Sequence, residues 1–509
     1  SSLTEASMLL VAPILLACAV PVLQVEATAD ELSLTVYSSA DPAGFDPQRY
    51  IAQQRAGFDP NFAWGVPGFG VVKTERTLSL TQGTNEVVFT DVAAFIDPTS
   101  VGFSDLTDPA TSVLEQSFRF DLVSPSKLLD RYLDREIEVR RSGPQRDEVI
   151  RGTLLSANQS QLVLRSASTG VTIIPMEGSQ VSLPELPGGL LTKPALLWRL
   201  QAAKGGDHRI RATYQTAGMT WRSDYNLVLG DDDASADLTA WVSLMNLSGI
   251  SYENASLKLV AGDVQRVQPR APMMRGRMVQ AMADTAAAGF EEQAFFEYHL
   301  YTLPRKTDLP ANSTQQLTLF PPVIGFEVEK ELLYAPTVGM GGWGQPMTER
   351  SVAPSGEGKA AVFVLFENKQ ANRLGMPLPA GKVRVFKQDP KDGTLEFVGE
   401  DMIDHTPRNE RVRLKLGEAF DVVGERKVVD FSVDTSRKTM SETIEVEIRN
   451  QKEAAQRVVV RERLYRWRNW KIVESTPEYR KLDASTVEWT VEIPAESRRT
   501  VRYRVDYSW

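Results

Sequence analysis

Apolar and polar residues alternate with a period of two over most of the C-terminal part of the chain. Nine segments between residues 359 and 509 share this alternation: AAVFVLFENK, KVRVFKQD, LEFVGED, RVRLKLG, KVVDFSVDT, TIEVEIRN, RVVVRERLY, VEWTVEIP and TVRYRVDYSW. Successive side chains of a strand point to opposite faces, so this period indicates strands with one buried face. Asp392-Gly393 is a favourable hairpin turn between two of them. The pattern predicts an antiparallel β-sandwich over residues 359–509.

The same alternation recurs closer to the N-terminus in shorter stretches. It predicts part of a β-domain over residues 66–124 and a central β-domain over residues 187–334. Between them, residues 125–186 contain about five short strands, and Gly152 followed by Leu154 is typical of the bent strands of small SH3-like or Sm-like barrels. The fold class predicted is therefore mainly β and multidomain, with antiparallel sandwiches and a small inserted barrel. Small barrels serve many functions, so RNA binding does not follow from this one.

Three stretches interrupt the alternation. Residues 30–65 contain two GFDP tetrapeptides without periodicity, and we expect an irregular lead-in. Residues 265–294 are rich in Met, Ala and Gly, which predicts a mobile loop. Residues 335–358 are rich in Gly, Pro and Ser and predict a linker or long loop.

The N-terminal segment resembles a secretion signal. About 16 apolar residues from Met8 to Leu23 are too few for a membrane-spanning helix, which needs about 20. Ala27-Thr28-Ala29 fits the small-residue pattern of a signal peptidase site, so we expect residues 1–29 to be a signal peptide. Two alternatives stay open: lipidation of Cys18 after cleavage at Leu15-Leu16-Ala17-Cys18, and an uncleaved anchor or buried strand. Cleavage implies a periplasmic or secreted protein, without a transmembrane helix in its mature form.

Composition and charge exclude several function classes. The 509 residues include 42% hydrophobic and 24% charged residues, as in ordinary folded proteins. A net charge of −9 disfavours nucleic acid as a partner, since binding to phosphate backbones needs a basic surface. One cysteine and three histidines exclude disulfide scaffolds and multi-histidine metal cages. No cofactor and no metal site are predicted.

Longer sequence blocks resemble a known family. The blocks are YQTAGMTWRSDYNLVL, WVSLMNLSGISYENASLKLVAGDV, EYHLYTLPRKTDLPANSTQQLTLF, LGMPLPAGKVRVF, FVGEDMIDHTP and LGEAFDVVGER. They are similar to the domain of unknown function 4139, found in bacterial envelope proteins of the mucoidy inhibitor A type, over roughly residues 190–509. The resemblance implies a secreted or periplasmic, mostly β protein without an established activity. The coiled coil typical of the mucoidy inhibitor proteins is absent, and the small barrel lies in the middle of the chain instead.

Residues capable of catalysis do not form a recognisable motif. His208, His299 and His405 lack metal-ligand spacing, and no G-x-S-x-G elbow supplies a serine for an Asp404-His405 pair. We expect structural hydrogen bonds from these histidines. The run Asp231-Asp232-Asp233 could bind calcium, but it is more typical of a solvated hairpin loop. The chain is thus predicted not to be an enzyme.

Aromatic, basic and methionine side chains supply the candidate interaction residues. Trp467 and Trp470 alternate with cationic residues, a pattern that favours a strand with one packed face but could also form a stacking platform for sugars or bases. Trp343 is surrounded by glycines, which indicates a better-exposed aromatic. The complete set of candidates is Trp343, Trp467, Trp470, Met273, Met274 and Arg275. The function predicted is a non-catalytic envelope scaffold that binds another envelope protein or associates with itself. A protein that binds cell-surface glycans through the tryptophans is the alternative, and a hydrolase with dispersed carboxylates is the third hypothesis.

Overall fold

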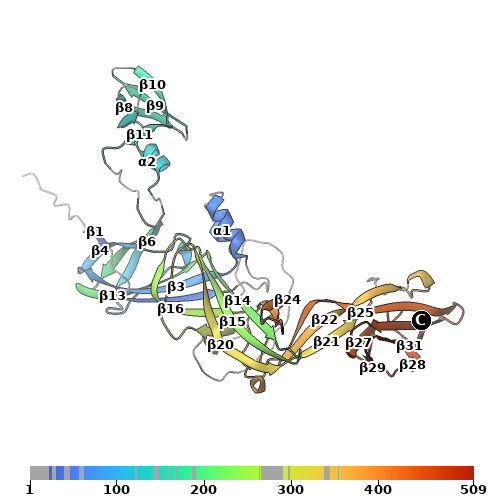
Figure 1. The fold of residues 1–509 in the computed structure, drawn as a ribbon. Helices are drawn as coiled ribbons and strands as arrows, with labels where there is room; N and C mark the ends of the chain where they lie inside the picture. Colours follow the sequence, from blue (N-terminus) through green and yellow to red (C-terminus); the bar gives the residue numbers. More distant parts are fainter. Residues whose placement is uncertain are drawn as a thin grey trace, which may run out of the picture.

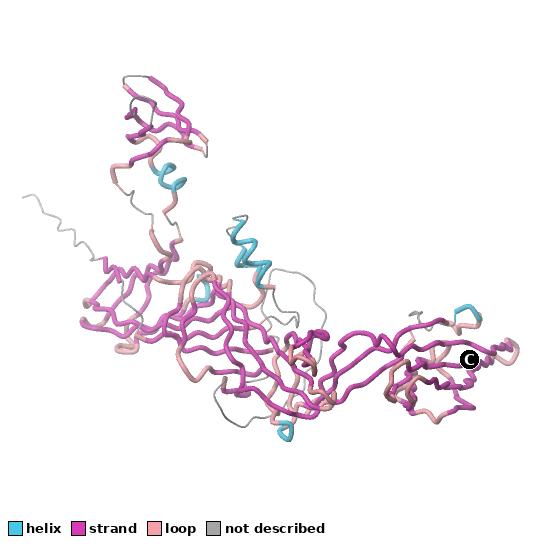
Figure 2. Tube along the Cα trace, viewed as in Figure 1, coloured by secondary structure: helices cyan, strands magenta, loops and turns pink. Residues whose placement is uncertain are grey.

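The computed structural model is an elongated β protein whose sheets are packed around three main cores (Figures 1 and 2). It describes residues 22–25, 30–38, 46–56, 62–120, 123–141, 148–158, 160–167, 170–185, 191–262, 264, 290–295, 298–336, 344–352 and 355–509. None of the helices in these ranges has the length and apolar character that crossing a bilayer requires. The predicted class, mainly β with several antiparallel sheets, is confirmed.

The central body contains three sheets that share one core. The four-stranded sheet has the order β1 (Val22–Val25), β4 (Gly83–Thr90), β12 (Ala195–Ala202), β6 (Ser112–Arg119). The eight-stranded sheet has the order β17 (Glu291–Phe295), β18 (Tyr298–Thr302), β16 (Tyr252–Ala261), β2 (Glu31–Tyr37), β3 (Phe69–Leu80), β13 (Gly206–Thr216), β5 (Gly102–Asp105), with β19 (Thr307–Leu309) beside β16. The five-stranded sheet has the order β20 (Ser313–Glu327), β15 (Ser235–Asn246), β14 (Met219–Leu229), β23 (Gly381–Gln388), β24 (Leu395–Ile403).

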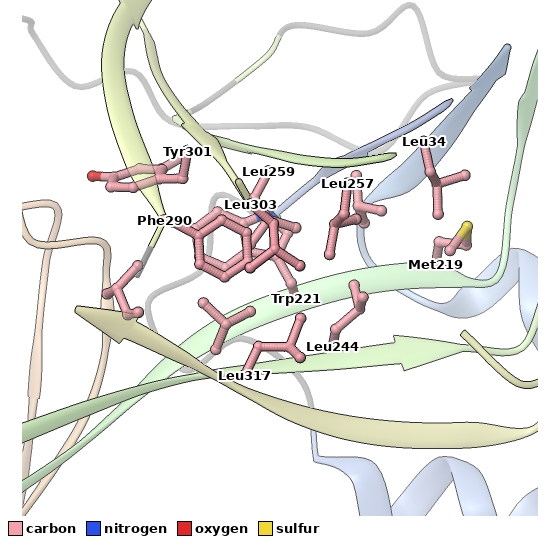
Figure 3. Packing of buried hydrophobic residues seen from close by; sticks show 14 of the residues in the cluster. Leu34, Met219, Trp221, Leu244, Leu257, Leu259, Phe290, Tyr301, Leu303 and Leu317 are labelled. Atoms are coloured by element: carbon pink, nitrogen blue, oxygen red, sulfur yellow. The ribbon is translucent and has the colours of Figure 1, made fainter. Parts of the chain in front are cut away.

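Large apolar side chains from these sheets fill the central core (Figure 3). Trp221 on β14 lies beside Tyr301 on β18, with ring centroids 6.1 Å apart. Leu34 and Val36 on β2 are fully buried, because β2 lies between β16 and β3. The prediction of an irregular lead-in was therefore wrong at residues 31–37. This strand is short and isolated in the sequence, so it lacks the neighbouring hairpin signals that reveal the others.

The C-terminal body is one nine-stranded sheet folded over its own core. Its order is β28 (Trp470–Thr476), β31 (Ser497–Ser508), β26 (Thr439–Asn450), β25 (Arg411–Asp434), β22 (Gly356–Glu367), β21 (Glu329–Tyr334), β27 (Gln456–Arg463), β30 (Thr486–Ile493), β29 (Arg480–Lys481). Because the sheet folds back, β30 packs against β26 and β31. This is the sandwich that the alternation predicts, with different membership. β21 joins it from the predicted central domain, whereas β23 and β24 belong to the central body.

Two long strands connect the central and C-terminal cores without a break. Val364 and Phe366 on β22 pack in the central core, whereas Ala360 on the same strand packs in the C-terminal core. On β25, Leu414 lies in the central core and Val422 in the C-terminal one. The predicted boundary at residues 335–358 therefore does not separate the two bodies, because the following strands belong to both.

The small inserted unit is an open sheet. It has the order β10 (Gly170–Pro175), β9 (Gln161–Ser166), β8 (Glu148–Ala157), β7 (Glu136–Arg141), β11 (Ser179–Ser182), with α2 (Pro125–Arg131) packed on its core. The five strands are as predicted, but the barrel is wrong, since β10 and β11 are not hydrogen-bonded to each other. The unit stands away from the central body (Figure 1). It leaves and rejoins that body at one point, where Val123 N–H donates to Leu191 O at 2.9 Å.

The remaining helical elements are short. They are α1 (Pro47–Ala56) and the 3-10 turns Phe62–Gly65, Pro98–Ser100, Arg350–Val352 and Gln370–Asn372.

The same asparagine arrangement occurs three times along the chain. Asn246, Asn368 and Asn450 are buried, and each donates its side-chain N–H groups to three backbone carbonyls. In each case one acceptor is the carbonyl of a proline: Pro310, Pro407 and Pro494. Two residues after each proline the backbone has a positive φ, at Asn312, Asn409 and Glu496. We call these arrangements asparagine clamps. Each one ties the end of a strand to the start of the strand that pairs with it: β15 to β20, β22 to β25 and β26 to β31.

Candidate functional site

The tryptophans predicted as contacts are engaged by the protein itself. Trp467 is only 9% exposed and belongs to the C-terminal core. The guanidinium carbon of Arg468 lies 4.7 Å from the centroid of its ring. Trp470 at the start of β28 is half-buried, donates Nε1–H to Ala484 O at 2.8 Å and has Lys481 Nζ 4.5 Å from its ring. The two rings do not form an open platform, since the alternation in this segment reflects packing of one side and solvation of the other.

The other predicted interaction residues lie outside the described ranges. They are Trp343, Met273, Met274 and Arg275, together with the proposed lipidation site Cys18. The end of the predicted mobile loop is described and differs from the prediction. Phe290 is 5% exposed within the central core, and β17 begins at the next residue. An apolar residue next to a glycine-rich stretch gives no sequence signal that distinguishes a buried anchor from loop.

A buried ion pair joins three strands of the C-terminal core. Arg426 on β25 donates from Nε to both carboxylate oxygens of Glu462 on β27, at 2.9 and 3.1 Å. Tyr503 on β31 donates its hydroxyl to Glu462 at 2.9 Å. Burial raises the pKa of Glu462 more than Arg426 lowers it. Burial disfavours the charged guanidinium, but the attraction of Glu462 and Tyr503 raises the pKa of Arg426 well above its usual range.

A second buried pair connects this core to the segment before β22. Arg466 Nε donates to Glu442 Oε2 at 2.7 Å, and the Glu442 carboxylate also accepts from the hydroxyls of Tyr465 and Tyr507. Arg466 Nη1 donates to Met347 O at 2.9 Å and to Glu349 O at 2.8 Å.

These four charged side chains are internal. Arg426, Glu442, Glu462 and Arg466 are each at most 1% exposed, so a substrate could not contact them in this conformation. Their effect is to fix the sandwich and to hold residues 344–352 against it. Sequence reasoning missed them because charged residues on alternating strands are usually solvated.

The three histidines make hydrogen bonds of the structural kind. His208 Nδ1 lies 2.6 Å from Asp105 Oδ2, with both side chains buried. His299 Nδ1 lies 2.7 Å from Glu292 Oε1, and His405 Nδ1 accepts from Ala380 N–H at 3.0 Å. No group of metal-ligating side chains gathers within the described ranges.

Asp105 has a depressed pKa although it is buried. Burial acts to raise the pKa, but hydrogen bonds from the Asp108 backbone, the Thr111 hydroxyl and His208 lower it below its usual range. These contacts place a charged carboxylate at the end of β5, where it fixes the loop that follows the strand.

In the triple-aspartate loop, lysines form ion pairs with Asp233. Asp233 pairs with Lys330 at 2.5 Å and also with Lys387. Asp232 Oδ1 accepts from the backbone N–H groups of Ala234 and Ser235. The loop therefore matches a hydrogen-bonded hairpin turn, and the carboxylates of Asp232 and Asp233 are already engaged by protein groups.

Exposed apolar side chains gather instead on strands at the edges of sheets. Val171 and Ile173 on β10 are each 62% exposed, and Leu395 and Phe397 on β24 are 55% and 56% exposed. Phe420, in the irregular part of β25 between the two cores, is 82% exposed. Large exposed apolar side chains on edge strands are typical contact points for other chains. The sequence did not reveal them because an exposed apolar residue and a buried one look the same in an alternating pattern.

Comparison with known families gives a match that covers more than half of the chain. The family described as Domain of unknown function (DUF4139) matches residues 210–509. This range begins within β13 and includes the strands of the central body from β14 onward and the whole C-terminal body, but not β1 to β6 or β12. The small inserted sheet lies outside it. A comparison with curated proteins finds no match.

Proposed function

The chain belongs to the DUF4139 family, and on that premise we propose that it is a non-catalytic scaffold of the bacterial envelope that holds partner proteins along an extended β framework. The narrower relationship to mucoidy inhibitor A-like proteins stays a prediction.

One observation carries the proposal: the central and C-terminal cores share continuous strands. β22 and β25 contribute buried side chains to both cores, so along these two strands the bodies are joined by regular β-structure and not by a flexible linker. The two bodies follow one another along a long axis (Figure 1). A framework of this kind supports a spacing role, because exposed residues on different bodies are held at a fixed separation.

The exposed apolar residues supply the contact points of such a scaffold. Ile173 lies on the small sheet, Phe397 on the central body and Phe420 at the junction with the C-terminal body. Burial of exposed apolar area drives most protein association, and aromatic side chains at the centre of interfaces contribute strongly.

An envelope location is part of the proposal and rests on the N-terminal segment. Its apolar stretch and Ala27-Thr28-Ala29 fit export and cleavage. Expression of the natural gene followed by separation of cell fractions tests this. The proposal expects mature protein outside the cytoplasm that begins near Asp30 and so lacks β1, the edge strand that pairs with β4 in the full chain. Cytoplasmic protein retaining residues 1–29 would contradict it.

Photo-crosslinking in native cells tests the scaffold role. A photoreactive amino acid is placed at Phe397 or Phe420, and as a matched control at Arg437, an exposed position in the β25–β26 turn. We expect a reproducible partner protein at the apolar positions and not at Arg437. Absence of any partner at both apolar positions contradicts the proposal.

The non-catalytic part of the proposal needs its own test. A panel of glycosides and esters is incubated with the purified protein, and any turnover is followed in carboxylate variants. Turnover that one carboxylate-to-amide substitution abolishes, while the variant keeps its melting temperature, would replace the scaffold with a hydrolase.

A further inference from the structure

The outer edge of the small sheet is an uncharged strand. β10 is the last strand of its sheet and pairs only with β9 in the described part of the chain. Its sequence, GVTIIP, contains no charged residue. Natural edge strands usually carry charges, prolines or bulges that prevent association, and of these β10 has only Pro175, at its last position. An uncharged edge with exposed Val171 and Ile173 therefore indicates a surface that is covered by another strand.

The backbone of β10 is oriented to accept such a strand. Just after β10, Met176 donates its N–H to Ser160 O, so the peptide groups of Met176 point towards β9. By the same register, the peptide groups of every second residue before it, Ile174, Thr172 and Gly170, also point towards β9. Peptide groups of successive residues point to opposite sides of a strand. Those of Val171 and Ile173 consequently face the open edge. Val171 and Ile173 each offer one N–H and one C=O, so together they can form four hydrogen bonds with an antiparallel neighbour.

We propose that β10 pairs antiparallel with β10 of a second copy of this chain, about a two-fold axis at Thr172. This inference rests on the scaffold role proposed above and names one of its partners. In that register, Val171 of each copy lies directly opposite Ile173 of the other copy, which gives two such pairs. Both residues direct their peptide groups outward, as a hydrogen-bonded pair requires.

Self-complementarity favours a second copy over other occupants. The paired side chains are β-branched and aliphatic in both directions, and such cross-strand pairs stabilise sheets. No like charges face each other, because β10 carries none. By contrast, β24 carries three acidic residues, Glu396, Glu400 and Asp401, and β11 has only four residues, SQVS.

The shape of the molecule leaves room for this partner. The small sheet projects from the central body, with β10 near the far end of the unit (Figure 1). A two-fold axis at this edge places the two central bodies on opposite sides of the dimer. The interface is small, so we expect a weak dimer that forms with rising concentration.

Sedimentation velocity of the whole chain over a range of concentrations tests the dimer. We expect the mass to rise from 56.5 kDa towards twice that value. Ile173→Lys should abolish the rise without changing the melting temperature, because the side chain is 62% exposed. Leu395→Lys, at a similarly exposed position on β24, is the matched control and should leave the dimer intact. A protein that stays monomeric at all concentrations overturns the proposal, as does a dimer insensitive to Ile173→Lys.

Cysteine crosslinking tests the register. In a Cys18→Ser background, which removes the single native cysteine, Thr172→Cys should form an intermolecular disulfide on mild oxidation, since directly opposed residues lie within bonding distance. Gln180→Cys on the opposite edge, β11, should not. In a mixture of the two variants, preferential crosslinking between positions 172 and 180 would mean head-to-tail assembly through β10 and β11 and would overturn the two-fold arrangement. If Phe397 and Phe420 capture other proteins while the chain stays monomeric, only the self-association fails.

Discussion

At the scale of single residues, the asparagine clamps concentrate stability in a few amide groups. Asn450 donates to the carbonyls of Ala454, Ile493 and Pro494 at 3.0, 3.3 and 2.9 Å. Asn450→Ala removes one hydrogen bond from each of these carbonyls, and an unsatisfied buried polar group costs about 1–3 kcal/mol. We expect about 3 kcal/mol of destabilisation in chemical unfolding. Gln456→Ala, which removes exposed hydrogen bonds in the same turn, should change the free energy of unfolding by less than about 0.5 kcal/mol.

The buried pair of Arg466 and Glu442 should respond differently to single and double substitution. Arg466→Met leaves the Glu442 carboxylate buried without its cation, which typically costs about 3–5 kcal/mol. Arg466→Met combined with Glu442→Leu removes both charges, so much of that loss should be recovered. Thermal and chemical unfolding of both variants measure this. A double variant less stable than the single one would show that the pair contributes more than its own desolvation cost.

Asp105 should give the protein an acid-sensitive contribution to stability. Its pKa is lower in the folded chain than when unfolded, so the unfolded state binds a proton more readily as the pH falls. The contribution is complete above the unfolded pKa, about 3.9, and is lost as the pH falls through the folded value. Asp105→Asn should therefore lower stability at pH 7 and weaken the dependence on pH below about 4. An unchanged acid limb of the stability curve in this variant would contradict the assignment.

At the scale of elements, β25 should couple the two bodies energetically. Leu414→Ala opens a cavity in the central core, with a typical cost of about 2–5 kcal/mol. Because β25 continues into the C-terminal core, hydrogen exchange should accelerate in β26 as well as in the central sheets. Leu244→Ala on β15 is the matched control, since it affects the same central core from a strand that ends there. In Leu244→Ala, faster hydrogen exchange should be confined to the central body. The same distribution of hydrogen exchange in both variants would contradict coupling through β25.

Strands were easier to predict from the sequence than their partners. All nine C-terminal alternating segments are strands, yet β23 and β24 join the central body, because β23 pairs in parallel with β14, more than 150 residues earlier. Periodicity reports that one face is buried and carries no information about which sheet buries it. The separate predictions RVRLKLG and KVVDFSVDT are halves of the single 24-residue strand β25. Gly417, the last residue of the first segment, lies at a register shift within that strand and not in a hairpin turn.

The candidate site was less accessible to sequence reasoning than the fold. Trp467 stands in a pattern that packing and ligand stacking both produce, and its 9% exposure shows packing. Val171 and Ile173 follow the ordinary alternation of a half-buried strand, but Leu162, Leu164 and Ile174 form the inner face and leave them outside. Which face of the sheet is buried depends on where α2 packs and on the order of the strands, and both are features of tertiary structure that a local pattern does not contain.

At the scale of the whole molecule, the small sheet should be a separable unit. Its chain enters and leaves at Val123 and Leu191, which are hydrogen-bonded to each other, and it has its own core. Replacement of residues 124–190 by a short glycine-containing loop should leave the main calorimetric transition within about 4 °C. A larger fall would show that the unit also stabilises the central body. In the same variant, the proposed dimer should be absent.

The continuity of β22 and β25 has a mechanical consequence. A tensile load applied between the central body and the C-terminal body acts nearly along these strands (Figure 1). Pulling the bodies apart would then slide β25 along β26, from Val422 opposite Asn450 to Asp434 opposite Thr439, which loads that ladder in shear. Shear requires many hydrogen bonds to break together, whereas peeling opens them one after another. The junction between the two bodies should thus resist stretching better than a pair of domains joined by a flexible tether. The small sheet, attached to the central body through two closely spaced ends, lies outside this path of load.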